Sequence, residues 1–280
     1  MNKLHSILIN GALALSLAAC QPIVAPPAAA PAMPEVTIKL TDQGLVVPAE
    51  IPAGVVTVTT ENDLSPAKQD PTRCGDGIVL VQLSAGVSKT AFLEAAAQGM
   101  PDLKLGTLLG GSCAKNDAPA HDIFDLQPGS YLAVRISETP DVAEINVKET
   151  GNQAAAPTAT VKVQMVDFSF IMPDEIKAGA QLWEFTNNGK QAHFMDIVRL
   201  KDGVSLDDFL KAVMAEHPSG PPPATEPAYW SITNPGATGW SHLNLEPGVY
   251  YALCFASDTA SQEHKMHVQE GMVRMFKVVK

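Results

Sequence analysis

The residues best able to do chemistry lie close together near the end of the chain. The segment YYALCFASDTASQEHKMHVQEGM (250–272) contains one cysteine, two histidines and a Gly-Met pair. Thiolate, imidazole and thioether groups bind metal ions such as copper. Two interpretations are open at this point. The segment is a metal-binding loop, or it is a buried cysteine followed by a polar hairpin that happens to contain histidines.

The elements that must position this segment belong to a unit that occurs twice. Three stretches of the first half match three stretches of the second half in the same order, which indicates a duplication. We therefore expect one domain over residues 35–149 and another over 161–280, joined by a linker at 150–160. The matched pairs are PAEIPAG (48–54) with PDEIKAG (173–179), AGVSKTAFLEAA (85–96) with DGVSLDDFLKAV (202–213), and DLQPGSYLAV (125–134) with NLEPGVYYAL (244–253).

Each copy has the pattern of short strands with a single helix. Alternating apolar and polar residues in VKVQMVDFSF (161–170) and RMFKVV (274–279) predict strands with one face toward a core. The stretch SLDDFLKAVMAEH (205–217) predicts a helix with Ser205 as its N-cap and Phe209 on its apolar face. Many short strands separated by Pro and Gly turns indicate an all-β fold of the β-sandwich type.

The second copy resembles the cupredoxins, small Greek-key β-sandwiches that hold type 1 copper. The resemblance spans most of the copy and rests on DFSFIMPDEIKAGAQLWEFTNNGKQAHF (167–194), LEPGVYYALC (245–254) and HVQEGM (267–272). It implies two tandem cupredoxin-like sandwiches, each with one inserted helix. It also implies one type 1 copper in the second copy, since two imidazoles, a thiolate and a weak thioether suit one-electron cycling. The implied ligands are His193, Cys254, His267 and Met272.

The second copy departs from the cupredoxin pattern in three respects. The gap between Cys254 and His267 is longer than in most single-domain members. Phe194 follows the first histidine, where the family usually has Asn, and Phe255 follows the cysteine, where it usually has a small polar residue. These changes either tune the potential or mark a site that no longer binds copper. His264 remains open as a replacement ligand, as a hydrogen-bonding partner or as a solvated residue.

The first copy lacks the implied ligands. Alignment of the two copies sets Asp76 opposite His193 and Arg135 opposite Cys254. The segment that follows Arg135 contains neither histidine nor a Gly-Met pair. We therefore expect the first copy to bind no type 1 copper.

The cysteines divide between the two copies and the N-terminus. Cys74 lies close to the first-ligand position of the first copy, and Cys113 lies just before the strand that enters the lost site. We propose a disulfide between them, because the protein is expected in an oxidising compartment, and this would leave Cys254 as the single free thiol. The alternative is that Cys74 and Cys113 are both reduced.

The N-terminus has the features of a secretory signal. MNKLHSILINGALALSLAAC (1–20) has a lysine, a short apolar stretch and small residues before Cys20. Its end resembles the bacterial lipobox, which implies removal of residues 1–19 and lipid attachment to Cys20. Residues 20–34, rich in Pro and Ala, then form a tether that holds the protein at a membrane face outside the cytoplasm.

The sequence also excludes some functions. A net charge of -11 argues against nucleic acid as a partner. The His-X-His and His-Cys-His motifs of multicopper oxidases are absent, as is the histidine that precedes the cysteine in copper nitrite reductases. We therefore expect an electron carrier rather than an enzyme. The carrier would exchange electrons with an extracytoplasmic redox protein. The alternatives are a metal-free binding module, with the helix and the PSGPPPATEPAYW loop (218–230) as its contact surface, and a copper carrier.

Overall fold

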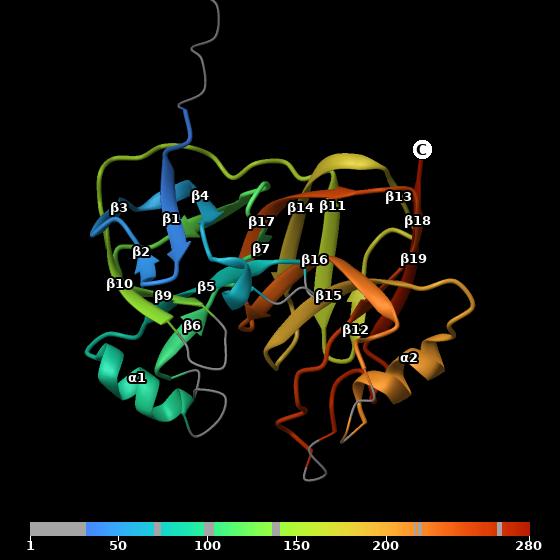
Figure 1. Ribbon diagram of the computed structural model, residues 1–280. Helices are drawn as coiled ribbons and strands as arrows, with labels where there is room; N and C mark the ends of the chain where they lie inside the picture. Colours follow the sequence, from blue (N-terminus) through green and yellow to red (C-terminus); the bar gives the residue numbers. More distant parts are fainter. Residues whose placement is uncertain are drawn as a thin grey trace, which may run out of the picture. The chain divides into compact units, whose positions relative to one another are not determined.

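The computed structural model describes residues 32–69, 74–97, 104–135, 141–215, 217, 220–261 and 265–280. The expected signal peptide, Cys20 and most of the tether lie outside these residues. From Pro31 onward the chain forms one compact unit. The fold is all-β with two β-sandwiches, each carrying one helix, as the sequence predicts (Figure 1).

One sheet runs through both halves of the chain, and each half adds a second sheet of its own. The shared sheet has eight strands in the order β12-β11-β14-β17-β8-β4-β1-β2, and its two halves join where β17 pairs with β8. The first-half strands here are β1 (Glu35–Thr41), β2 (Gly44–Val46), β4 (Gly54–Asn62) and β8 (Ala120–Leu126). The second-half strands are β11 (Val161–Val166), β12 (Ser169–Ile171), β14 (Gly179–Asn187) and β17 (Thr238–Leu245).

The second sheet of each half completes its sandwich. In the first half the order is β3-β10-β9-β5-β6, with β7 also paired to β5, and in the second half it is β13-β19-β18-β15-β16. The first set comprises β3 (Glu50–Pro52), β5 (Asp76–Leu83), β6 (Gly106–Leu108), β7 (Cys113–Ala114), β9 (Gly129–Arg135) and β10 (Asp141–Lys148). The second comprises β13 (Glu175–Lys177), β15 (His193–Leu200), β16 (Ala224–Thr233), β18 (Gly248–Leu253) and β19 (Val273–Val279).

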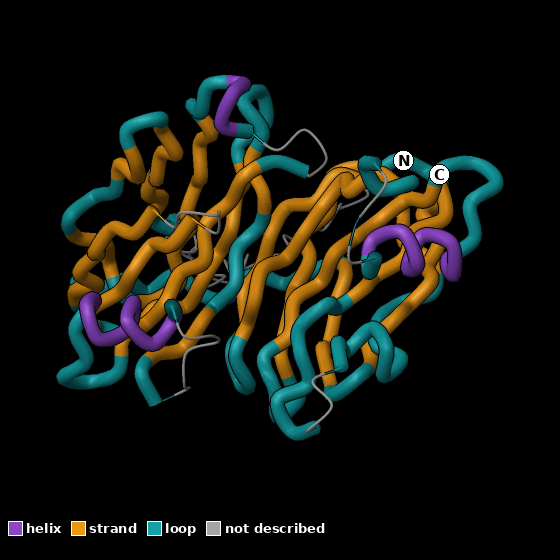
Figure 2. Tube along the Cα trace, turned by 60° about the horizontal axis from the view of Figure 1, so that its bottom comes forward, coloured by secondary structure: helices purple, strands orange, loops and turns teal. Residues whose placement is uncertain are grey.

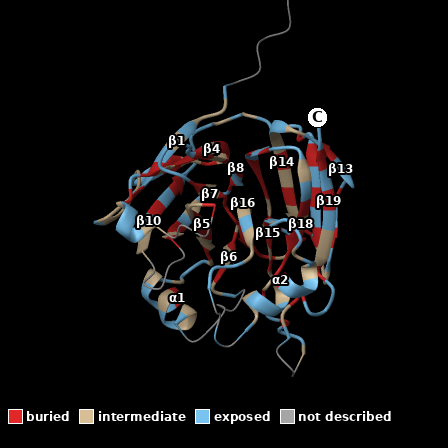
Figure 3. Cartoon of the chain, turned by 45° about the vertical axis from the view of Figure 1, so that its right-hand side comes forward, coloured by how far each residue is buried: buried red, intermediate tan, exposed pale blue. Residues whose placement is uncertain are grey.

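Burial alternates along many strands, as expected when one face of each sheet packs on a core. In β11 the apolar residues Val161, Val163 and Met165 are buried, while the polar residues between them are exposed. Strands and loops make up most of the fold (Figure 2), and buried residues line the space between the sheets (Figure 3).

The two helices occupy matching places in the repeat and begin in the same way. Ser88 accepts a hydrogen bond from a backbone N–H of α1 (Lys89–Ala96), and Ser205 does the same for α2 (Leu206–Val213). The helix α2 is shorter than predicted, although Phe209 is buried on its apolar face as expected. Among the described residues, neither helix has the length and apolarity to cross a lipid bilayer. A short 3-10 helix, η1 (Pro66–Lys68), completes the set.

One predicted strand is interrupted. The stretch 161–170 forms two antiparallel strands, β11 and β12, because the chain reverses at Asp167 and Phe168. Phe168 has a φ of 63°, the left-handed conformation that bulky residues rarely adopt. The alternating pattern carries no sign of this turn, and the turn places both residues beside the candidate site.

Candidate metal centre

Each implied ligand lies at the end of a strand or in the loop that joins two strands. His193 is the first residue of β15, and Cys254 directly follows β18. His267 and Met272 lie in the loop that leads from β18 into β19. Because β15 and β18 pair antiparallel, the start of one strand lies beside the end of the other. The sheet thus brings His193 and Cys254 together.

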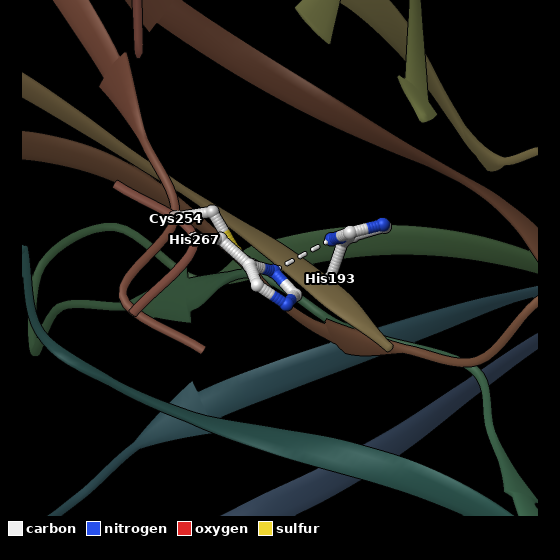
Figure 4. A group of neighbouring side chains, drawn as sticks. All are labelled: His193, Cys254 and His267. Atoms are coloured by element: carbon white, nitrogen blue, oxygen red, sulfur yellow. Dashed lines mark hydrogen bonds between the residues drawn. The ribbon is translucent and has the colours of Figure 1, made fainter. Parts of the chain in front are cut away.

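Three of the four side chains converge. His193 Nδ1 lies 3.0 Å from His267 Nδ1, and Cys254 Sγ lies 3.5 Å from His267 Nδ1 (Figure 4). One ligand atom from each residue falls within 4.8 Å of the others, and all three residues are fully buried. Two nitrogens at about 2.0 Å and a sulfur at about 2.3 Å from a metal ion would be separated by such distances.

Met272 is linked to the group through the backbone. Its N–H donates to the carbonyl of His267 over 2.9 Å, and its carbonyl accepts from the N–H of Cys254 over 3.3 Å. The side chain of Met272 is fully buried. The backbone therefore fixes Met272 relative to two of the three converging residues.

Asp167 orients the first histidine. Its Oδ1 lies 3.1 Å from His193 Nε2, and it also accepts hydrogen bonds from the backbone N–H groups of Lys190 and Gln191. Burial raises the pKa of Asp167, but these hydrogen bonds outweigh burial, so the net pKa is lowered. An ionised carboxylate can only accept, so His193 Nε2 carries the proton and Nδ1 presents its lone pair to the site.

The sulfur of Cys254 lies in a dry, hydrogen-bonded environment. Burial raises the pKa of Cys254 to about 11, although backbone hydrogen bonds from Phe194 and Ala256 oppose this shift. The group is therefore a neutral thiol at pH 7 in the absence of a metal ion. Because Phe194 uses its backbone for this contact, a phenylalanine after the first histidine keeps a hydrogen bond to the sulfur.

The long gap between Cys254 and His267 is accommodated by a local hairpin. Ser257 pairs with Met266 across an isolated β-bridge, and the N–H of Asp258 donates to the carbonyl of Lys265. The N–H of His267 donates to the carbonyl of Ala256 over 2.7 Å. Extra residues in the hairpin therefore do not separate the two ligands. His264 lies outside the described residues.

Gln191 holds this hairpin to the start of β15. Its Nε2 donates to Asp258 Oδ1 over 2.7 Å, and its Oε1 accepts from the N–H and the hydroxyl of Thr259. Since Gln191 lies two residues before His193, one side-chain amide connects the strand of the first ligand to the loop of the others.

Neither histidine ring reaches the surface. Burial lowers the pKa of His267 to about 4, with a further lowering from His193, and burial also lowers the pKa of His193. Both rings are therefore neutral at pH 7 and can act as ligands. The ring of Phe168 packs edge-on against His267 at a centroid distance of 5.2 Å. His267 Nε2 is buried without a hydrogen-bond partner among the described residues.

The donor set and its protonation fit a soft or borderline metal ion. Two neutral imidazoles and a sulfur, all buried and with donor atoms within 4.8 Å of one another, are a set that copper accepts. The group His193, Cys254 and His267 can therefore hold a metal ion. Sequence reasoning did not identify Asp167 or Gln191, although alignment of PAEIPAG with PDEIKAG sets Asp42 opposite Asp167 and could have drawn attention to that turn.

The first half has a different set of contacts at the matching place. Asp76 is the first residue of β5 and accepts from the guanidinium of Arg135, the last residue of β9. Cys74 and Cys113 form a disulfide, and Cys254 is the free cysteine of the described residues.

No known family profile matches the sequence, and no curated protein matches it. Among solved structures, auracyanin B has 19% identity and a TM-score of 0.30, covering 45% of this chain and 94% of its own. A multicopper oxidase has 12% identity and a TM-score of 0.23, covering 88% of each chain. A copper-containing nitrite reductase from Thermus scotoductus has 10% identity and a TM-score of 0.24, covering 89% of this chain and 62% of its own. Each of these likenesses is weak, with a TM-score of 0.30 or less.

Proposed function

We propose that the protein binds one copper ion in its second half and carries electrons. The observation that supports this most strongly is the convergence of His193 Nδ1, His267 Nδ1 and Cys254 Sγ in a buried site. Bound copper would supply one-electron redox chemistry, and Met272 would serve as a weak fourth ligand. The protein's own residues hold the donor atoms in place and keep water away from them.

The burial of both histidines defines how electrons would reach the site. A ring edge at the surface would give direct contact with a partner, but both rings are fully buried. Phe168, which is half-buried, covers His267. We therefore propose that a partner docks at the β11–β12 turn, where the ring of Phe168 packs on His267.

The location that fits this function is outside the cytoplasm. The disulfide between Cys74 and Cys113 is typical of an oxidising compartment. The proposal includes removal of residues 1–19, a lipid on Cys20 and attachment to a bacterial membrane through the tether. The partner would be another extracytoplasmic redox protein, and the protein itself would act as a carrier rather than as an enzyme.

A copper titration tests the proposal. Cu(II) is added to the soluble form that begins after Cys20, and the absorption spectrum is recorded. We expect an intense blue thiolate-to-copper band that saturates at one equivalent and disappears in Cys254→Ala. The control is His242→Ala, a change at an exposed position of β17, which keeps the band. A wild-type protein that stays colourless and copper-free overturns the proposal.

One observation favours a second function, that of a metal-free binding module. A cavity of about 330 Å³ lies beside α2. Its lining includes the apolar residues Phe209, Val213, Phe255 and Met266 and the acidic residues Asp196 and Glu226. Cavities of this size and character accommodate small molecules. In this alternative, the metal-free protein binds ligands there. Ligands that cause NMR shift changes confined to the cavity residues, in a protein that takes up no copper, would support this second function over copper binding.

A further inference from the structure

Asp167 occupies the same place in its half as Asp42 does in the first half. Both residues follow the first strand of their copy, and each accepts a hydrogen bond from a backbone N–H in the loop after the strand that pairs parallel to it. Asp42 Oδ1 accepts from the N–H of Ser65 over 2.9 Å, and Asp167 Oδ1 accepts from the N–H of Lys190 over 2.8 Å. The backbone contact is therefore a property of the repeated fold. The contact with a histidine occurs in the second copy.

The second copy also has the space that this contact needs. A Cβ atom built on Gly189 would lie 2.5 Å from Asp167 Oδ1 and 2.7 Å from His193 Nε2, closer than real contacts allow. The alignment that pairs Asp42 with Asp167 sets Leu64 opposite Gly189. Only glycine allows the loop to pack on the carboxylate and the imidazole at this position. The loop thereby covers a hydrogen bond whose imidazole is already fully buried.

We propose that Asp167 is a positioning residue for the metal centre: its carboxylate holds His193 in the tautomer that offers Nδ1 to copper and stabilises Cu(II) relative to Cu(I). This inference rests on the proposed function. A carboxylate that accepts from the distal N–H of a ligand histidine fixes the ring and makes the imidazole a stronger donor. Its negative charge also favours the more positive oxidation state, because a nearby unit charge of opposite sign is attractive at low dielectric.

The proton arrangement in the metal-free protein follows from the same contact. With the proton on His193 Nε2, the short contact between the two Nδ1 atoms requires the hydrogen to come from His267. His267 Nε2 is then a bare acceptor, in keeping with its lack of a partner among the described residues. The two rings therefore have opposite tautomers, which NMR can distinguish.

The first experiment uses nitrogen-15 NMR on the metal-free soluble form. We expect a protonated Nε2 for His193 in the wild type and a mixture of tautomers in Asp167→Ala. The matched control is Asp42→Ala, which loses the equivalent backbone contact in the first half and leaves His193 unchanged. A wild-type His193 with its proton on Nδ1, or an unchanged tautomer in Asp167→Ala, would overturn the proposal.

The second experiment measures copper. We expect Asp167→Ala to raise the Cu(II) dissociation constant by about 10- to 100-fold, while Asp42→Ala stays within about twofold of the wild type. Asp167→Asn keeps an acceptor but removes the charge, so its midpoint potential should rise, whereas that of Asp42→Asn should not. Equal affinities for the two alanine variants, or an unchanged potential in Asp167→Asn, would contradict the proposal. If the wild type binds no copper, the proposed function fails, and the NMR result still decides the role of Asp167.

Discussion

The two halves of the molecule use the same place in the fold in different ways. In the second half, the start of β15 and the end of β18 bring His193 beside Cys254. In the first half, the matching strands bring Asp76 to within 3.0 Å of Arg135. Both pairs are largely buried. The same place in the fold therefore holds an ion pair in one half and a candidate metal-binding group in the other.

In the first half, Arg135 has further hydrogen-bond partners besides Asp76. The guanidinium of Arg135 also contacts Asp141 and the carbonyl of Lys68. Arg135 is 8% exposed. A cation held in this way repels a metal ion, and Asp76 and Arg135 stand where the second half has an imidazole and a thiol, which explains physically why the two halves differ in their expected chemistry.

The largest effect should come from breaking this pair. Asp76→Ala leaves the buried charge of Arg135 partly uncompensated and should lower the free energy of unfolding by about 3 kcal/mol, as measured by urea denaturation. The double variant Asp76→Ala with Arg135→Leu should recover most of this loss, because no buried charge remains. Equal stability of the wild type and Asp76→Ala would show that the Asp76–Arg135 pair does not stabilise the first half.

The second prediction concerns the pH dependence of copper binding. The pKa of Cys254 is raised to about 11, so binding displaces one proton from the thiol at any pH well below that value. The affinity for Cu(II) should therefore rise about tenfold per pH unit between pH 6 and 9. The histidines should contribute little there, because the pKa of His267 is about 4. Titrations at several pH values provide the check, and an affinity independent of pH would show that the thiol is not a ligand.

A smaller effect is expected at the link between β15 and the ligand hairpin. Gln191→Ala removes the side-chain hydrogen bonds to Asp258 and Thr259 and should weaken copper binding by about tenfold. The loss of unfolding free energy should be near 1 kcal/mol. Asn244→Ala, at an exposed position of β17, is the control and should change neither quantity. Gln191→Ala with wild-type copper affinity would show that the hairpin holds its shape without this link.

The sequence suggests candidate ligands, but it does not suggest the residues that support them. His193, Cys254, His267 and Met272 could be proposed because their types and order resemble a known pattern. Asp167 and Gln191 act through hydrogen bonds to residues far away in the chain, which no local pattern indicates. The turn at Phe168 was missed because a bulky residue with positive φ gives no sequence signal.

The repeat was the most informative feature of the sequence for the fold. It predicted two all-β copies with one helix each, and the structure confirms this fold class. It did not predict that one eight-stranded sheet would run through both copies, because the pairing of β8 with β17 is set by the packing of the halves.

The most direct test of the contrast between the two halves is a crystal structure of the copper-loaded soluble form, with anomalous scattering recorded at the copper edge. Our account predicts one strong peak, bonded to His193 Nδ1, His267 Nδ1 and Cys254 Sγ, and no peak between Asp76 and Arg135. A loaded crystal with no copper at Cys254, or with copper bound only elsewhere, would contradict it.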